Sequence, residues 1–234
     1  MKRFSIILFT LLLLAVCRPA AAQQDTTWFN VDNELEILHQ QIEEVDDPKF
    51  KPLHLIGVKY GYNFSNARVT PSMDTKWQGS PNCLSITYTY YNSLWKMLDI
   101  FGFQGEFKYY KDPVSIENLG DNVFTMLELS AVSQFRINFS RFRFLVNIGP
   151  YVGYRIKNDR EGGVWNQYDN RFDYGLIGGL GFAVVFSPVE FHLEGNYKFA
   201  LSSMYHANIL SDQYWVFAYP STIFASLGVF VNLW

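Results

Sequence analysis

The residues of this sequence that could do chemistry gather near its C-terminal end. Glu190, His192 and Glu194 occupy every second position, so in a β-strand all three side chains project from one face. A histidine beside carboxylates is suited to general acid–base catalysis. The same residues also suit a buried polar network, in which each charge is neutralised by a neighbour. The elements that carry them must decide between these two interpretations.

A glycine cluster just before this stretch invites a second chemical interpretation. Gly175, Gly178, Gly179 and Gly181 lack the spacing of a dinucleotide-binding fingerprint, and no strand–helix–strand unit surrounds them. Gly175, Gly179 and Gly181 fall on one face of a strand, where missing side chains make room for large neighbours and let the strand curve. The sequence therefore predicts a structural role for these glycines, and no cofactor.

The first 22 residues have the pattern of an export signal. Lys2 and Arg3 precede an apolar run over 4–16, and Ala20 and Ala22 supply small residues before a cleavage point. The apolar run is too short to span a bilayer. The sequence therefore predicts a signal peptide at 1–22 and an exported mature chain.

The mature chain divides into an acidic segment and a nearly neutral remainder. Residues 23–50 hold eight acidic residues and one lysine, a net charge of 1 − 8 = −7, whereas the chain from residue 51 onward has 15 − 14 = +1. An apolar stripe at helical spacing over 29–46 predicts a helix with an acidic opposite face. We expect 23–50 to be either a poorly ordered leader or a helix that docks under the rest of the fold or onto a periplasmic partner; a third alternative is that it enters the interior of the fold. The sequence contains no basic face of the kind that binds nucleic acid.

From residue 53 the hydrophobic period becomes two, which indicates strands. Eight segments are predicted, separated by alternately long and short connections, as in an antiparallel up-and-down barrel. Each segment is long enough to cross a bilayer as a tilted strand. The soluble alternative is a secreted lipocalin-like barrel. The predicted strands are 53–64, 83–91, 99–110, 123–137, 142–156, 172–186, 189–200 and 222–234.

The positions of the charges favour the membrane barrel over the soluble one. The apolar faces of the predicted strands are rich in Phe and Tyr, whereas the opposite faces carry all eleven charges of the strand interiors together with Gly, Ser and Asn. The interior of an eight-stranded barrel is only just wide enough for side chains, so we expect the large rings to point outward to lipid and the charges to point inward. The sequence predicts an inner polar network of twelve residues: Lys59, Glu106, Lys108, Glu128, Arg136, Arg143, Arg155, Asp173, Glu190, His192, Glu194 and Lys198.

Four stretches also resemble a known family. They are MLELSAVSQFRIN (126–138), FRFLVNIGPYVGY (142–154), RFDYGLIGGLGF (171–182) and FHLEGNYKFALSSMY (191–205). In this order they are similar to the PorT-like outer-membrane β-barrel proteins of Bacteroidetes, which are Gram-negative bacteria. The resemblance is strong over 123–234 and looser over 53–110. It implies an eight-stranded barrel in the outer membrane and brings no catalytic motif. Within this family, PorT itself is associated with secretion, whereas most relatives have no assigned role.

The predicted organisation is a signal peptide at 1–22, an acidic periplasmic segment at 23–50 and an outer-membrane barrel at 51–234. We expect a monomeric, non-enzymatic structural, assembly or secretion-associated component, with no catalytic, cofactor or metal site. The expected partners are outer-membrane lipid and a periplasmic or secretion-machinery protein bound through 23–50. The alternatives are an enzyme acting on lipid A or peptides, and a narrow channel. The aromatic connection at 201–221 is expected to fold back over the barrel mouth or to recognise a surface ligand.

Overall fold

The computed structural model describes residues 52–91, 101–117, 120–159, 163–208, 210–211 and 215–233. The predicted signal peptide, the acidic segment at 23–50 and Trp234 lie outside these residues. The strands are β1 (Leu53–Thr70), β2 (Thr75–Lys76), β3 (Gln78–Tyr91), β4 (Phe101–Ile116), β5 (Gly120–Phe139), β6 (Phe142–Asn158), β7 (Phe172–Phe186), β8 (Val189–Ala200) and β9 (Phe217–Asn232).

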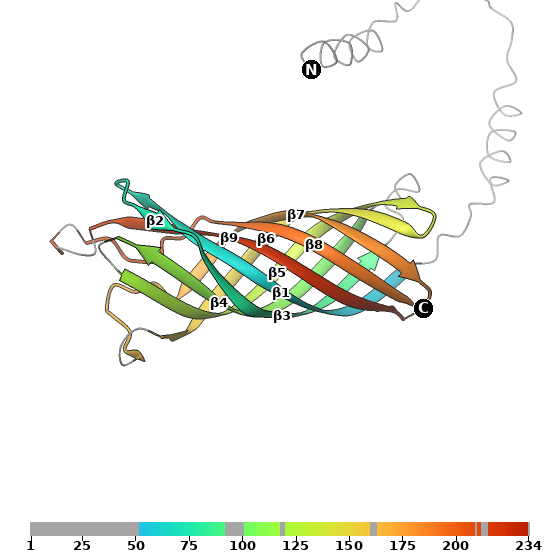
Figure 1. Ribbon diagram of the computed structural model, residues 1–234, viewed down its shortest axis with the longest axis horizontal. Coiled ribbons are helices and arrows are strands. Elements are labelled where there is room, and N and C mark those ends of the chain that lie inside the picture. Colours follow the sequence, from blue (N-terminus) through green and yellow to red (C-terminus); the bar gives the residue numbers. More distant parts are fainter. Residues whose placement is uncertain are drawn as a thin grey trace, which may run out of the picture. The chain divides into compact units, whose positions relative to one another are not determined.

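The eight long strands form one closed antiparallel barrel (Figure 1). Each long strand pairs with the next one along the chain, and β9 pairs with β1 from Leu55↔Asn232 to Thr70↔Phe217. The two-residue strand β2 only extends the edge of β4. The predicted eight-stranded, antiparallel, up-and-down fold is therefore confirmed. Among the described residues, no helix has the length and apolar character that a membrane span requires.

The two ends of the barrel differ in their connections. The end where β8 begins carries the short turns at 140–141 and 187–188, and β1 begins and β9 ends there; we call it the short-turn end. The opposite end carries the connections at 159–171 and 201–216, and we call it the long-loop end. In Figure 1 the long-loop end is on the left and the short-turn end on the right.

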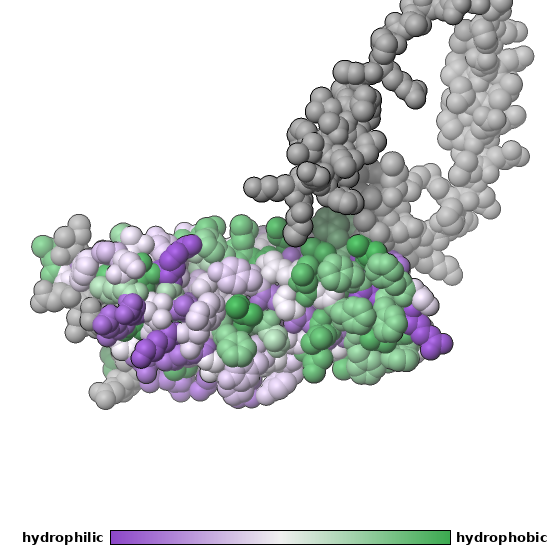
Figure 2. All heavy atoms as spheres, turned by 45° about the horizontal axis from the view of Figure 1, so that its top comes forward, coloured by the Kyte–Doolittle hydropathy of each residue, from purple (hydrophilic) through white to green (hydrophobic). Residues whose placement is uncertain are grey.

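Inward and outward side chains alternate along every long strand because of the strand pleat. In β8, Glu190, His192 and Glu194 are buried, whereas Phe191 and Leu193 are half exposed. The same alternation around the barrel leaves a continuous outer surface of Phe, Tyr, Leu, Ile and Val side chains. Figure 2 shows these apolar residues gathered over the short-turn part of the visible face, with more polar residues toward the long-loop end.

Several strands run further toward the long-loop end than the sequence predicts. Strand β1 continues past 64 to Thr70, β4 continues past 110 to Ile116, and β9 begins at Phe217 instead of 222. Connections expected over 65–82 and 111–122 are therefore mostly strand. The reason is that the two faces exchange their character here: Ala67 and Val69 are buried while Arg68 is exposed. A prediction that recognises strands by their polar inner faces therefore ends the strand at that point, too early.

The apolar inner faces close the long-loop end. Tyr110, Phe124 and Phe224 from the strands pack with Met204 and Tyr205 from the connection after β8. This connection is held by backbone hydrogen bonds from Met204 to Ala218 and from His206 to Tyr168. Of the two expectations for the aromatic connection, the structure shows the fold-back over the barrel mouth.

Two of the glycines singled out in the sequence lie where backbones approach closely. A Cβ atom on Gly175 would come within 2.1 Å of the carbonyl oxygen of Phe199, and one on Gly179 within 2.4 Å of that of Gly195. Both partners belong to β8, so these glycines allow β7 and β8 to pack tightly. Their role is structural, as the spacing indicates.

Candidate functional site

The charged interior is the part of the barrel in which chemistry-bearing side chains come together. The structure places all twelve residues of the predicted polar network on the inner faces of the strands. Eleven of them are buried, with 6% exposure or less. The twelfth, Arg143, lies near the short-turn end, and its side chain is 17% exposed.

In the short-turn half of the interior, charged groups follow one another without a break. Arg143 Nη1 lies 2.5 Å from Glu190 Oε1, and Glu190 Oε2 lies 3.2 Å from His192 Nε2. On its other side, His192 Nδ1 lies 3.6 Å from Glu194 Oε1, and Glu194 Oε2 accepts a hydrogen bond of 2.7 Å from Lys59. The imidazole is therefore held between two carboxylates. Its ring also stacks on Phe230, with the ring centroids 4.0 Å apart.

The series of ion pairs continues from Lys59 toward the middle of the barrel. Glu106 Oε2 lies 3.5 Å from Lys59 Nζ, and Glu106 Oε1 lies 3.9 Å from Lys108 Nζ. Lys108 then donates a 3.2 Å hydrogen bond to Glu128. The Lys108 ammonium also lies 4.2 Å from the centroid of the Phe224 ring, so the polar series borders directly on the apolar cluster of the long-loop end.

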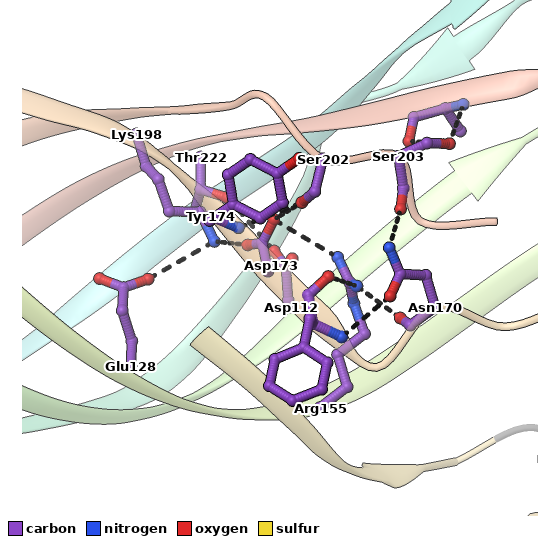
Figure 3. A network of polar contacts seen from close by, with 12 residues as sticks. Asp112, Glu128, Arg155, Asn170, Asp173, Tyr174, Lys198, Ser202, Ser203 and Thr222 are labelled. Atoms are coloured by element: carbon purple, nitrogen blue, oxygen red, sulfur yellow. Dashed lines mark hydrogen bonds and ion pairs between the residues drawn. The ribbon is translucent and has the colours of Figure 1, made fainter. Parts of the chain in front are cut away.

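Lys198 carries the series to the long-loop end (Figure 3). Its ammonium lies 3.5 Å from Glu128 and 3.0 Å from Asp173, and Arg155 Nη2 lies 3.7 Å from Asp173. Arg155 also donates a 2.6 Å hydrogen bond to the carbonyl oxygen of Asn170. We call this whole series the ion-pair chain: Arg143, Glu190, His192, Glu194, Lys59, Glu106, Lys108, Glu128, Lys198, Asp173 and Arg155.

Neighbours in the ion-pair chain are of opposite charge along its length when His192 is protonated. A buried charge is costly unless an opposite charge and hydrogen bonds compensate for it. The alternation provides that compensation for each carboxylate and each cation in turn. The interior can therefore hold many charges in the small bore of an eight-stranded barrel.

Asp112 is an interior charge that the sequence analysis missed. It is completely buried, accepts hydrogen bonds from Ser65 at 2.5 Å and from Thr222 at 3.3 Å, and forms no ion pair with another described residue within 4.0 Å. Its inward orientation could have been predicted, because Asp112 lies an even number of residues after Glu106 and Lys108 and therefore on the same face of β4. The prediction ended that strand at 110. With Asp112 included, the interior holds six acidic residues and six Lys or Arg residues, and is neutral when His192 is neutral.

Arg136 stands outside the ion-pair chain and helps to close the short-turn end. Its guanidinium carbon lies 4.1 Å from the centroid of the Tyr91 ring. The Tyr91 hydroxyl donates a hydrogen bond to Gln134, and the Tyr91 ring packs in a buried cluster with Leu55 and Phe230. Apolar and aromatic side chains therefore close the interior at this end, as another cluster does at the long-loop end.

Among solved structures, the chain is similar to Neisserial surface protein A, with a TM-score of 0.51 and 12% sequence identity over 77% of this chain and 97% of that one. This likeness shows a shared barrel fold. The chain is also similar to Ail, the attachment invasion locus protein of Yersinia pestis (TM-score 0.42, 19% identity, 76% of this chain and 98% of that one), and to the translocator domain of autotransporter NalP from Neisseria meningitidis (TM-score 0.31, 12% identity, 86% and 96%). No family model matches the sequence, and no curated protein matches it either.

The interior geometry bears on the catalytic interpretation of His192. A carboxylate oxygen lies 3.2 Å from its Nε2 and another lies 3.6 Å from its Nδ1, and a phenyl ring stacks on its face, so side chains of the protein itself surround the imidazole. The ring is also only 2% exposed. Within the described part of the chain, no group of three or more His, Cys, Asp or Glu residues could hold a metal ion. The arrangement of His192 is therefore suited to joining Glu190 and Glu194 within the ion-pair chain.

Proposed function

We propose that this chain spans the outer membrane as a non-enzymatic structural or assembly barrel, associated with secretion through its periplasmic segment at 23–50. The observation that carries the proposal is the pairing of an apolar outer wall with a filled, charge-compensated interior. In a soluble barrel the two faces would have the opposite character.

The outer wall supports the membrane placement. Large side chains such as Leu129, Ile86, Leu193 and Leu180 are each about half exposed on it. Removing apolar surface from water is favourable by roughly 25 cal/mol per Å². The acyl chains of a membrane around the barrel would remove this wall from water. The predicted export signal at 1–22 agrees with this placement.

The interior supports a structural role over an open pore or an enzyme. Fully buried Lys59, Lys198, Arg155, Tyr91 and Phe230 rank among the largest side chains inside the barrel. Side chains therefore fill the bore, as is usual for a barrel of eight strands. The ion-pair chain ties together β1, β4, β5, β6, β7 and β8, which lends the wall rigidity.

The association with secretion rests on the resemblance to PorT-like proteins and on the acidic segment. Residues 23–50 carry a net charge of −7 directly before the first strand. A short acidic segment tethered to a barrel can attach it to a basic surface of a periplasmic protein.

Crosslinking and mass spectrometry on intact outer membranes test the attachment. The full chain and a chain lacking 23–50 are compared, both with the export signal retained. We expect one or more periplasmic proteins to crosslink to the full chain and to disappear on deletion. Crosslinks that survive the deletion would remove the segment from the proposal.

Two further measurements test the membrane placement and the filled interior. A membrane barrel requires detergent and shifts its gel mobility on heating, and a chain that stays soluble without detergent and shows no shift would overturn the placement. In planar bilayers we expect no unit conductance. Unit conductance that changes in Arg143→Ala would establish the narrow channel instead. A change in the mass of lipid A when the chain is expressed, lost in His192→Ala, would establish an enzyme.

A further inference from the structure

The barrel wall is incomplete between β8 and β9 near the long-loop end. Strand β8 ends at Ala200, which pairs with Gly175 of β7, and its last partner on β9 is Ser221. Strand β9 nevertheless runs back to Phe217, with β1 as its partner on the other side. Residues 217–220 of β9 therefore have no β8 residues beside them.

The chain after β8 fills part of this gap. The remainder of the gap forms a notch. Leu201 donates a backbone hydrogen bond to Tyr174 of β7, and Met204 donates one to Ala218 of β9. The notch has a volume of about 370 Å³, and the side chains of Tyr174, Phe217 and Tyr219 line it. Tyr174 and Phe217 are about half exposed there.

Polar groups accompany these aromatic rings. Asn170, Ser203 and His206 also line the notch, and His206 is exposed. Aromatic faces combined with amide, hydroxyl and imidazole groups are suited to a sugar ring, which has an apolar face and a hydroxylated rim. The notch therefore has the chemistry of a carbohydrate site.

Arg68 adds a cation beside the notch. It projects outward from β1, directly opposite Tyr219 in the register. Its guanidinium carbon lies 4.5 Å from the centroid of Phe199 and 5.8 Å from that of Tyr219. No described residue forms an ion pair with Arg68 within 4.0 Å. A guanidinium group held against rings in this way is prepared to bind a phosphate with two parallel hydrogen bonds.

The same wall is hollowed further toward the short-turn end. One hollow of about 400 Å³ lies beside Gly61 and Ala225, and another of about 470 Å³ lies beside Phe191 and Gly228. Leu193 and Leu227 line both hollows, so the two adjoin each other. The side chains around them are almost entirely apolar, as acyl chains require.

We propose that this wall, from β7 across β8 and β9 to β1, binds one outer-leaflet glycolipid with a phosphorylated sugar headgroup. The sugar lies in the notch against Tyr174, Phe217 and Tyr219, its phosphate binds Arg68, and an acyl chain occupies the apolar hollow beside Gly61 and Ala225, the nearer of the two hollows to the long-loop end. This inference rests on the membrane placement proposed above. The occupant is a glycolipid because an ordinary phospholipid has a phosphate and acyl chains but no sugar ring to fill an aromatic notch.

Binding of lipid A to the full-length barrel folded in detergent tests the site, with native mass spectrometry to count bound lipids and a titration to measure affinity. We expect one tightly bound lipid A per barrel and about tenfold weaker binding in Arg68→Gln, the loss expected for one charge-assisted contact. Phe217→Ala, which removes an aromatic side of the notch, should weaken binding while retaining the heat-dependent gel shift of a folded barrel.

Lys157→Gln provides the matched control. It removes the same charge from an exposed residue of β6, which is four strands away from β1 in the barrel order, and should leave binding unchanged. Equal losses in Arg68→Gln and Lys157→Gln would overturn the site in favour of general electrostatic attraction. Equal binding of phosphatidylglycerol would overturn it in favour of ordinary surrounding lipid. Neither outcome affects the membrane placement, which the detergent requirement and the gel shift test separately.

Discussion

The ammonium group of Lys59 on β1 lies 2.7 Å from the carboxylate of Glu194 on β8, although 135 positions separate the two residues in the sequence. Strand β9 lies between β1 and β8, so the contact reaches past a whole strand inside the barrel. Lys59 also contacts Glu106 on β4. This one side chain therefore joins the short-turn half of the ion-pair chain to the rest.

Replacing Lys59 by Met should destabilise the barrel by about 3–5 kcal/mol, because Glu106 and Glu194 each lose a buried counter-charge. The free energy of unfolding in lipid vesicles, measured by urea titration, checks this. The double variant Lys59→Met with Glu194→Gln should recover part of the loss, since one of the two stranded carboxylates is then neutral. A double variant less stable than Lys59→Met alone would contradict the role of Lys59 as their shared partner.

The inner face of each strand could be predicted from sequence, but the contacts across the interior could not. Lys59 and Glu194 share an inward parity that the residue pattern shows directly. Their meeting depends on the sum of two register shifts, that of β1 against β9 and that of β9 against β8, and β1 and β9 lie at opposite ends of the strand sequence. A single sequence contains no measure of that sum.

The missed residue Asp112 provides a second test of charge compensation. At hydrogen-bond distance, Asp112 has only hydroxyl partners among the described residues, whereas Asp173 is in direct contact with both Lys198 and Arg155. Asp112→Asn should therefore change the free energy of unfolding by less than about 1 kcal/mol, and Asp173→Asn should cost about 3–5 kcal/mol. Urea titration of both variants at neutral pH gives the comparison. Equal losses would show that Asp112 depends on a cation as much as Asp173 does.

Asp112 and its neighbours also show why the long-loop end was poorly predicted. Beyond Asp112, the buried residues of β4 are Pro113, Val114 and Ile116, so the alternation of polar and apolar residues breaks down although the strand continues. Proline in this position suggests a loop when the sequence is read alone. Pairing with β5, up to Ile116↔Gly120, keeps the segment in the sheet.

The outer wall carries a belt of exposed apolar side chains. A charged substitution should leave the stability of the barrel unchanged only outside this belt. Leu129 projects outward from β5 with 56% exposure. Leu129→Arg should lower the free energy of unfolding in vesicles by about 2–4 kcal/mol, as expected for arginine at the bilayer midplane. Thr70→Arg is the control, because Thr70 is exposed at the long-loop end of β1. Similar effects of the two substitutions would argue against a membrane around the belt.

Asp159, just beyond the end of β6, offers a prediction on pH. Hydrogen bonds from Lys157 at 2.8 Å and Lys111 at 3.3 Å hold the pKa of its carboxyl below the ordinary value. A lowered pKa means that these contacts stabilise the fold at neutral pH and are lost as the pH falls through that lowered pKa. In an NMR titration, Lys157→Gln should raise the pKa of Asp159, and added salt should do the same in the wild-type chain. A pKa that is unchanged by both would contradict the role of the lysines.

The connection that closes the long-loop end should depend on its buried side chains. Met204 and Tyr205 are each 1% exposed within the apolar cluster, and the Tyr205 hydroxyl accepts a hydrogen bond from Asn122 at 3.2 Å. Met204→Ala should cost about 2–5 kcal/mol in local stability through the cavity that it leaves. Because those side chains anchor the connection together with its backbone hydrogen bonds, the connection should then open more readily without unfolding of the strands. Limited proteolysis should cleave Met204→Ala faster within 201–216, with the heat-dependent gel shift unchanged. His206→Ala, which alters an exposed side chain of the same connection, should be cleaved at the wild-type rate, and equal acceleration in both variants would show that the buried cluster does not hold the connection closed.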